Sequence, residues 1–466
     1  MLKLLILLNV FFVSFTDKPE KSAPALSPRA VEQRAKWDIP TDAMDYPVAH
    51  LYVDSLRRMG VKVFHTSRWF NGATVEMPDT LATKVQNLDF VEAVEMTRDN
   101  SESLYASKRR VITREETSDA PGIVTEQQLG LYNLLPLHEA GFEGQGILMA
   151  VCDGGFYNAN ILTCFRHEQE LGHFDFTDDA DDFYGYTGAH GTECLSAISG
   201  IQDGFYGAAT KADYYLMRTE EYSTESPKEM DNLVAAFEKA DSLGVNVFSV
   251  SLGYANFDNT DWDLDKNTDL DGKTTRVSRA ATIAARKGML VCVAAGNEGN
   301  NAWRTISAPA DADSVLSIGA VTTDSVIANF SSYGPSSDGR VKPEVCAVGV
   351  QATLINPGGV IVNANGTSFA TPLLAGLAAS LWSALPDENA MHIRSRIIRS
   401  ADHYLNPDMD QYGYGIPDAW KAYTMGPEGI EDVQTETTSC QKIVRNGQII
   451  ILRNGIEYTI SGQRVR

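Results

Sequence analysis

The stretch NGTSFATP, residues 365–372, is followed by the run LLAGLAASLWSAL, residues 373–385, which is apolar and rich in small residues. The run predicts a buried helix with Pro372 in its first turn, where proline is tolerated because the first backbone N–H groups have no partner inside the helix. Ser368 then lies at or near the helix start, where free N–H groups and the helix dipole favour negative charge. A serine in this place is either a simple cap or a nucleophile, and the rest of the chain decides between them.

Length and composition describe an ordinary globular protein. The 466 residues leave room for two or three domains, and 43% of them are hydrophobic and 21% charged. The formal net charge of −22 argues against a nucleic-acid partner, which would require clustered Lys and Arg.

The chain opens with MLKLLILLNVFFVSF, one early lysine followed by a mostly apolar run. This charge order predicts a signal peptide over residues 1–22, and the alternative is a buried N-terminal strand. We favour the signal peptide because the polar segment TDKPEKSAP follows at once, and we therefore expect a secreted, cell-surface or periplasmic protein. No later segment has 18 uninterrupted apolar residues, so we expect no transmembrane segment in the mature chain.

Four regions follow the leader. Residues 45–97 have a compact α/β pattern, and residues 98–126 form a charged linker that contains SKRR at 107–110. Residues 127–425 alternate strand and helix, which predicts an α/β fold with a doubly wound, mainly parallel sheet and helices on both faces. Residues 427–466 contain short β-prone runs separated by Asn-Gly pairs, which indicate a small β tail.

Within residues 127–425, side chains that can take part in catalysis follow the predicted strands or begin the predicted helices. Asp153 follows the apolar run ILMAVC, Asn297 follows MLVCVAAG, and His190 begins the helix of GAHGTECLS. Ligands of such sheets bind beyond the carboxyl ends of the strands, so these side chains and Ser368 are candidates for one site. A serine needs a base, a histidine can supply it, an aspartate fixes the imidazole tautomer, and an amide stabilises an oxyanion.

The segments AVCDGGF, GAHGTECLS, AAGNEGN and NGTSFATP, in this order, resemble the subtilisin-like serine proteases, or subtilases. The resemblance covers residues 127–425. It implies a triad in which Asp153 orients His190, His190 is the base and acid, and Ser368 is the nucleophile, with Asn297 in the oxyanion hole. Gly154 departs from the family, which usually has Ser or Thr after the aspartate.

The resemblance also implies the surroundings of this triad. SVSLG, residues 249–253, is similar to the family's substrate edge, so Ser251, Leu252 and Gly253 would pair with an extended peptide. Ala294, Ala295 and Gly296 would form the opposite wall. Residues 45–97 look similar to the family's inhibitory propeptides, which implies a zymogen processed between Thr97 and Glu126, and the alternative is an accessory domain that stays attached. The tail is similar to sorting signals of exported bacterial proteases.

The loop DNTDWDLDKNTDLDG, residues 258–272, contains six aspartates. Asn267, Asp269 and Asp271, followed by Gly272, resemble the beginning of a calcium loop, but Ser278 stands where an EF-type loop has its last carboxylate. We favour a solvated acidic loop over a structural calcium site, and we expect no cofactor to be required for catalysis.

These patterns predict a secreted serine endopeptidase whose partners are polypeptide substrates and its own propeptide. An esterase or peptide ligase on the same site is one alternative, because an acyl-enzyme can pass to other nucleophiles. An exported binding protein with a silent protease domain is the other.

Overall fold

The computed structural model describes residues 8–19, 22–100, 114–116, 124–178, 182–185, 188–221, 224–426, 441–445, 448–453 and 456–459. These residues belong to two compact units, 1–423 and 424–466. Residues 1–7 of the expected leader, most of the expected linker and residues 427–440 lie outside the described residues.

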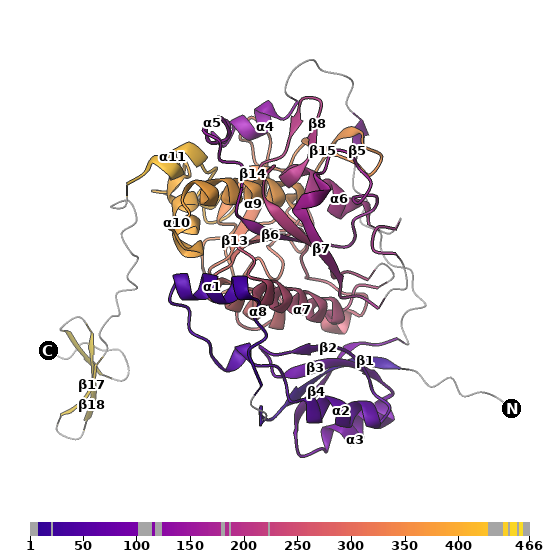
Figure 1. Ribbon diagram of the computed structural model, residues 1–466. Helices are drawn as coiled ribbons and strands as arrows, with labels where there is room; N and C mark the ends of the chain where they lie inside the picture. Colours follow the sequence, from indigo (N-terminus) through magenta and orange to yellow (C-terminus); the bar gives the residue numbers. More distant parts are fainter. Residues whose placement is uncertain are drawn as a thin grey trace. The chain divides into compact units, whose positions relative to one another are not determined.

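The centre of the first unit is a seven-stranded sheet in which every neighbouring pair is parallel (Figure 1). Its order is β14 (Val345–Val348), β13 (Leu316–Val321), β12 (Leu290–Ala294), β11 (Val247–Val250), β6 (Leu148–Asp153), β10 (Asp213–Arg218) and β7 (Glu170–Asp175). Strands β6, β11, β12, β13 and β14 are buried along their whole length, as continuous apolar runs covered on both faces must be. The expected α/β fold with a parallel sheet is confirmed.

Helices cover both faces of this sheet. The core on one face includes α6 (Ala189–Ser199) and α9 (Thr367–Ala384), and α10 (Ala390–Ser400) packs on α9. The core on the other face includes α7 (Pro227–Leu243) and α8 (Arg276–Arg286). Shorter helices α4 (Glu126–Gly130), α5 (Leu135–Glu139) and α11 (Ala419–Thr424) complete this part. A three-stranded sheet of order β15 (Ala352–Ile355), β16 (Ile361–Ala364) and β5 (Arg114–Glu116) leads into α9, and β8 (Ile201–Gln202) pairs with β9 (Phe205–Tyr206).

The N-terminal residues form an antiparallel sheet of order β2 (Lys62–Ser67), β3 (Gly72–Met77), β1 (Asn9–Phe15) and β4 (Val91–Arg98). Helices α2 (His50–Arg58) and α3 (Asp79–Gln86) contribute to its core, and α1 (Pro28–Lys36) lies against the end of α7 (Figure 1).

The interpretation of residues 1–22 as a signal peptide is not compatible with β1, an interior strand of this sheet. Phe11, Val13 and Phe15 belong to the domain core, while the ring of Phe12 lies under the guanidinium of Arg276 from α8. Both faces of β1 are thus covered, and an interior strand covered on both faces is as continuously apolar as a leader. The alternative of a buried strand is therefore correct for residues 9–15, and the domain expected over 45–97 begins at β1.

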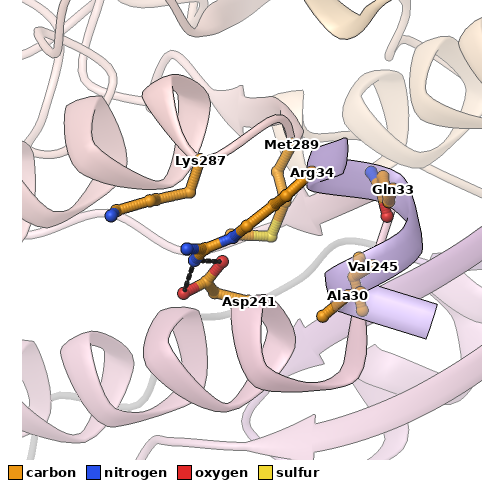
Figure 2. A pocket seen from close by; sticks show the side chains of 8 residues that line it. Ala30, Gln33, Arg34, Asp241, Val245, Lys287 and Met289 are labelled. Carbon is orange, nitrogen blue, oxygen red and sulfur yellow. Dashed lines mark hydrogen bonds and ion pairs between the residues drawn. The ribbon is translucent and has the colours of Figure 1, made fainter. Parts of the chain in front are cut away.

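The N-terminal domain is held on α7 and α8 by buried charges. Glu238 of α7 accepts hydrogen bonds from Ser67 Oγ at 2.5 Å, Arg68 N at 2.8 Å and Trp69 N at 3.1 Å. Arg34 of α1 donates to both oxygens of Asp241 at 2.6 and 2.8 Å, and Figure 2 shows this pair in the pocket between α1 and the ends of α7 and α8. The carboxylate of Asp45 joins Arg34 to Lys287 in the same network.

Residues 441–459 of the second unit contain β17 (Gln441–Arg445), β18 (Gln448–Arg453) and β19 (Ile456–Thr459), paired antiparallel in that order. They lie within the segment for which the sequence predicts a small β tail. No helix among the described residues is long and apolar enough to cross a membrane.

Candidate active site

The side chains of Asp153 and His190 meet at the carboxyl end of the parallel sheet. Asp153 is the last residue of β6, and His190 is the second residue of α6. His190 Nδ1 lies 2.9 Å from each carboxylate oxygen of Asp153, so the carboxylate accepts the Nδ1–H hydrogen bond. This leaves Nε2 as the ring nitrogen that can take up a proton.

Glycines allow this approach, because the turn after β6 and the start of α6 are in backbone contact. A Cβ on Gly188 would lie 2.2 Å from Gly155 Cα, and one on Gly191 would lie 2.3 Å from Gly155 O. Gly154, the departure noted in the sequence, donates its backbone N–H to Asp153 Oδ1 at 2.7 Å. The backbone therefore supplies one hydrogen bond to the carboxylate.

The carboxylate sets the protonation of the imidazole. Burial by itself lowers the pKa of His190, but the charge of Asp153 and its hydrogen bond outweigh burial and raise this pKa well above its ordinary value. Cys194 Sγ lies 3.8 Å from His190 Nδ1, and burial raises the pKa of this thiol to about 11, so it is neutral at physiological pH.

Ser368 is the second residue of α9, beside the end of β11. Its hydroxyl donates to the backbone oxygen of Ser251 at 3.2 Å, and the Ser251 hydroxyl donates to the backbone oxygen of Ser368 at 2.8 Å. Cys194 Sγ also donates to Ser368 O, at 3.4 Å, and therefore contacts both Ser368 and His190. Among the described residues, no hydrogen bond joins the Ser368 hydroxyl to the imidazole directly.

Pro372 explains why the Ser368 carbonyl has partners outside the helix. It is the sixth residue of α9, so the expectation of a proline in the first turn is wrong by about half a turn. A helical carbonyl at position 368 normally accepts from the N–H of residue 372, and proline has none. The Ser251 hydroxyl and the Cys194 thiol take the place of that donor and fix the start of the helix.

Asn297 is oriented by the residue before Ser368. Its Oδ1 accepts hydrogen bonds from the backbone N–H and from the hydroxyl of Thr367, both at 2.9 Å. Because the carbonyl end of the amide is occupied, its Nδ2 group is directed away from Thr367 and can donate elsewhere. The N–H of Ser368, at the second position of α9, is one of the early helix N–H groups that have no acceptor inside the helix.

The predicted substrate segments lie at the carboxyl ends of the adjacent parallel strands β11 and β12. Ser251 is buried, and Leu252 and Gly253 are half-buried. Ala294 and Ala295 are buried, and Gly296, at φ +112°, leads into Asn297. A Cβ on Gly296 would lie 2.7 Å from Ser332 Oγ, so only glycine fits this wall without movement.

The acidic loop uses its side chains for its own turns. Asp269 accepts from Asp265 N at 2.9 Å, and Asp271 accepts from Lys273 N and Thr274 N, both at 2.7 Å. Slight burial opposes ionisation of Asp271, but these backbone hydrogen bonds lower its pKa. Asn267 is exposed, and its own N–H donates to Asp265. These hydrogen bonds hold the turns of the loop.

Sequence reasoning missed a second group of acids. One carboxylate oxygen each of Glu220, Glu225 and Glu229 lies within 4.8 Å of the others, a donor set that suits a hard cation. Burial, followed by the charges of Glu220 and Glu225, raises the pKa of Glu229 well above its ordinary value. The only sequence signal is the density of glutamates in residues 220–229.

Comparison with known proteins identifies the family. The family model described as "Subtilase family" matches residues 144–416, more than half of the chain. The chain belongs to the subtilase family. A model described as "Peptidase S8 propeptide domain, Bacteroidota" matches residues 10–114, which confirms the resemblance of the N-terminal domain to subtilase propeptides and includes all of β1 except Asn9.

Curated subtilases align with the same region. Subtilisin NAT from Bacillus subtilis subsp. natto is 29% identical over 285 residues, 60% of this chain and 66% of that protein, slightly less than two thirds of its length. Subtilisin from Bacillus pumilus is 29% identical over 285 residues, 60% of this chain and 92% of that protein.

Solved structures support the fold. MycP1 from the ESX-1 type VII secretion system has a TM-score of 0.53 at 23% identity, covering 68% of this chain and 91% of that one. MycP1 from Mycobacterium smegmatis has the same TM-score and identity, and the match covers 68% of this chain and 90% of that one.

Proposed function

We propose that this subtilase is a serine endopeptidase that is made as a zymogen and processes itself. The observation that carries the proposal is the hydrogen bond of the Asp153 carboxylate to His190 Nδ1 beside the start of α9, where Ser368 lies. The aspartate keeps the proton on Nδ1, which leaves Nε2 free to act as a base.

In the reaction, Ser368 Oγ attacks the carbonyl carbon of the scissile peptide bond and gives its proton to His190 Nε2. The carbonyl oxygen becomes an oxyanion, to which Asn297 Nδ2 and the Ser368 backbone N–H would donate. Collapse of the intermediate breaks the C–N bond, and the imidazolium protonates the leaving amine. Water then repeats the sequence on the acyl-enzyme and restores Ser368.

The hydroxyl must leave Ser251 O before it can bond to the imidazole. Catalytic hydrogen bonds are often long or misdirected without substrate and tighten in the complex, which fits the arrangement found here.

We propose polypeptide substrates and the N-terminal domain as an intramolecular inhibitor. Ser251, Leu252 and Gly253 would pair with an extended peptide, and Ala294, Ala295 and Gly296 would face it. The buried contacts of Glu238 and Asp241 with the N-terminal domain support a lasting interaction with the enzyme before cleavage. We also propose that residues 127–425 are catalytic and that the cut falls within residues 98–126.

Export is a separate proposal, and a structural calcium ion at Asn267, Asp269 and Asp271 is the alternative to a solvated acidic loop. The resemblance to exported proteases supports export, and cell fractionation of the tagged chain tests it. The aspartates of residues 258–272 support calcium, and a thermal unfolding midpoint that is the same in calcium and in a chelator would contradict it.

A fluorophosphonate probe tests the nucleophile. We expect the processed protein to be labelled at Ser368 and Ser368→Ala to remain unlabelled, with turnover lower by about a millionfold, as in a related triad. Ser383→Ala, a serine of the same helix that bonds to Ser380 O, is the matched control and should be labelled normally. Equal labelling of wild type and Ser368→Ala would refute the proposal, and transfer of the acyl group mainly to added amines would favour the ligase alternative.

A further inference from the structure

Residues 22–45, which lie between β1 and α2 in the sequence, extend from the N-terminal sheet onto the catalytic part of the chain. We call this segment the strap; it contains α1 and the short 3₁₀ helix η1 (Ala43–Asp45). The N-cap residue of α1, Ser27, donates its backbone N–H to the backbone oxygen of Ser242, near the end of α7, at 2.8 Å. The strap therefore adds a contact to the one that the sheet makes with Glu238.

The strap binds where strands of the parallel sheet begin. Arg29 donates to the backbone oxygens of Gly146 and Gly244, both at 3.1 Å, and to Asn246 Oδ1 at 2.7 Å. Gly146 lies just before β6, and Asn246 directly precedes β11. Asp153 is the last of the six residues of β6. Because an extended chain advances about 3.3 Å per residue, the strap and the candidate active site are about 17 Å apart along this strand.

The surface under α1 consists of hydrogen-bond acceptors at the ends of two helices. Gly244 is the C-cap of α7, and Gly288 follows the C-cap of α8. The last carbonyl groups of a helix have no N–H partner inside it and carry the negative end of the helix dipole. Arg29 and Gln33, one turn apart on α1, donate to the carbonyl oxygens of Gly244 and Gly288 at 3.1 and 3.4 Å. A helix with donors at this spacing fits the surface.

Ion pairs of both polarities join the strap to the enzyme. Arg34 of the strap pairs with Asp241 of α7 at 2.6 Å. In the opposite sense, Lys287 of the enzyme pairs with Asp42 at 3.0 Å and with Asp45 at 2.9 Å. The side chains of Arg34, Asp241 and Lys287 are buried together (Figure 2). Charges that alternate in sign across a contact select one partner and disfavour others, so this surface is specific for the strap.

We propose that the strap is a second attachment of the N-terminal domain, which keeps this domain on the enzyme after the chain is cut and so determines how long inhibition lasts. It lies at the opposite end of the strands from the candidate active site, and its contacts do not require an occupied cleft. Attachments that belong to one domain raise each other's effective concentration, so the pair can exceed either affinity by about 10²–10⁴-fold. The inference rests on the proposed function, because it takes the N-terminal domain to be an inhibitor that is cut from the enzyme.

The alternative is that the strap acts only in the uncut chain. In that case the sheet and its contacts with Glu238 hold the cut domain by themselves. The two possibilities differ in whether substitutions in the strap change the time for which the cut domain remains bound.

The test uses the full Ser368→Ala chain with the recognition sequence of a site-specific protease inserted within residues 98–126. The added protease makes the same cut in every variant, and the Ser368→Ala chain cannot digest the released domain through the proposed nucleophile. Size-exclusion chromatography at increasing times after dilution then measures the fraction of the N-terminal domain that elutes with the enzyme. Most of the affinity lost through an interface substitution is expected to appear as faster dissociation.

Two strap variants differ in severity. Arg34→Ala leaves Asp241 buried in the complex without this partner, and we expect dissociation about a hundredfold faster. Arg29→Ala removes an exposed side chain whose acceptors can turn to water, so it should fold normally and dissociate about threefold to tenfold faster. Arg57→Ala is the matched control, because Arg57 is exposed and pairs with Asp54 of its own helix, and it should dissociate like the parent chain.

Equal dissociation rates for the parent chain, Arg29→Ala and Arg34→Ala would overturn the inference, and Arg29→Ala decides the matter if Arg34→Ala does not fold. The same substitutions in the chain with Ser368 intact should shorten the lag before full peptidase activity by the same factors. If that chain never cuts itself, the proposed function fails, whereas the chromatography still shows whether the strap retains the N-terminal domain.

Discussion

Gly191→Ala tests how the structure positions the base, because it adds a single methyl group beside His190. The new Cβ would lie 2.3 Å from Gly155 O and 2.8 Å from Asp153 Cβ, whereas ordinary contact begins at 3.4 Å. Neither neighbour is the free end of a flexible side chain. The start of α6 and the turn after β6 must therefore separate by about 1 Å, and a misplacement of this size near reacting groups costs about 100-fold in rate.

The expected result is a kcat lowered about 100-fold with little change in KM, because His190 moves relative to Asp153 while the substrate segments stay in place. Alanine in a helix is intrinsically favoured over glycine by about 1 kcal/mol, so any loss of stability must come from the steric overlap. Overpacking of a core costs about 1–3 kcal/mol, and we therefore expect a net loss of up to about 2 kcal/mol in the free energy of unfolding.

The assay is steady-state hydrolysis of a peptide substrate, with urea unfolding of the same preparations. Gly130→Ala is the matched control, because a Cβ at this helical glycine has no heavy atom within 4 Å, and it should leave kcat unchanged. A Gly191→Ala enzyme that keeps kcat within about threefold of wild type would refute the reasoning that close glycine contacts fix the imidazole.

Three further predictions concern charge and hydrogen bonding. Asn297→Ala should lower kcat by about 10²–10³-fold with KM nearly unchanged. A loss that appears mainly as a rise in KM would contradict the role of Asn297 in the transition state. Since Asp153 raises the pKa of His190, activity should be lost as pH falls through this raised value. Asp153→Asn should lower kcat about 10⁴-fold and move the acid limb of the kcat/KM profile to lower pH. An acid limb that does not move would count against the assignment of Asp153. Arg34→Ala leaves Asp241 buried with one fewer partner. In the unprocessed Ser368→Ala chain, this second substitution should lower the free energy of unfolding in urea by about 3 kcal/mol. A decrease below about 1 kcal/mol would mean that this network does not hold the domains together.

The sequence predicted the parallel sheet because continuous apolar runs, such as that of Leu148–Asp153, alternate with helical segments, as in a sheet covered on both faces. It placed the candidate catalytic residues at the ends of elements because Gly-rich turns follow those runs. The same rule failed at Asn9–Phe15, since a leader and an interior strand covered on both faces are equally apolar and local pattern does not separate them. Only the pairing of β1 with β3 and β4 decided that case.

What the sequence determined by itself was the kinds of residue available and their order along the chain. What the tertiary structure decided was contact between distant residues: the bond of Asp153 to His190, the exchange of hydrogen bonds between Ser251 and Ser368, and the seating of residues 114–116 on β16. The physical reason is that periodicity and turn chemistry report on neighbours within a few residues. Hydrogen bonds between residues 37, 117 and more than 200 positions apart form only when the packed sheet brings their backbones together.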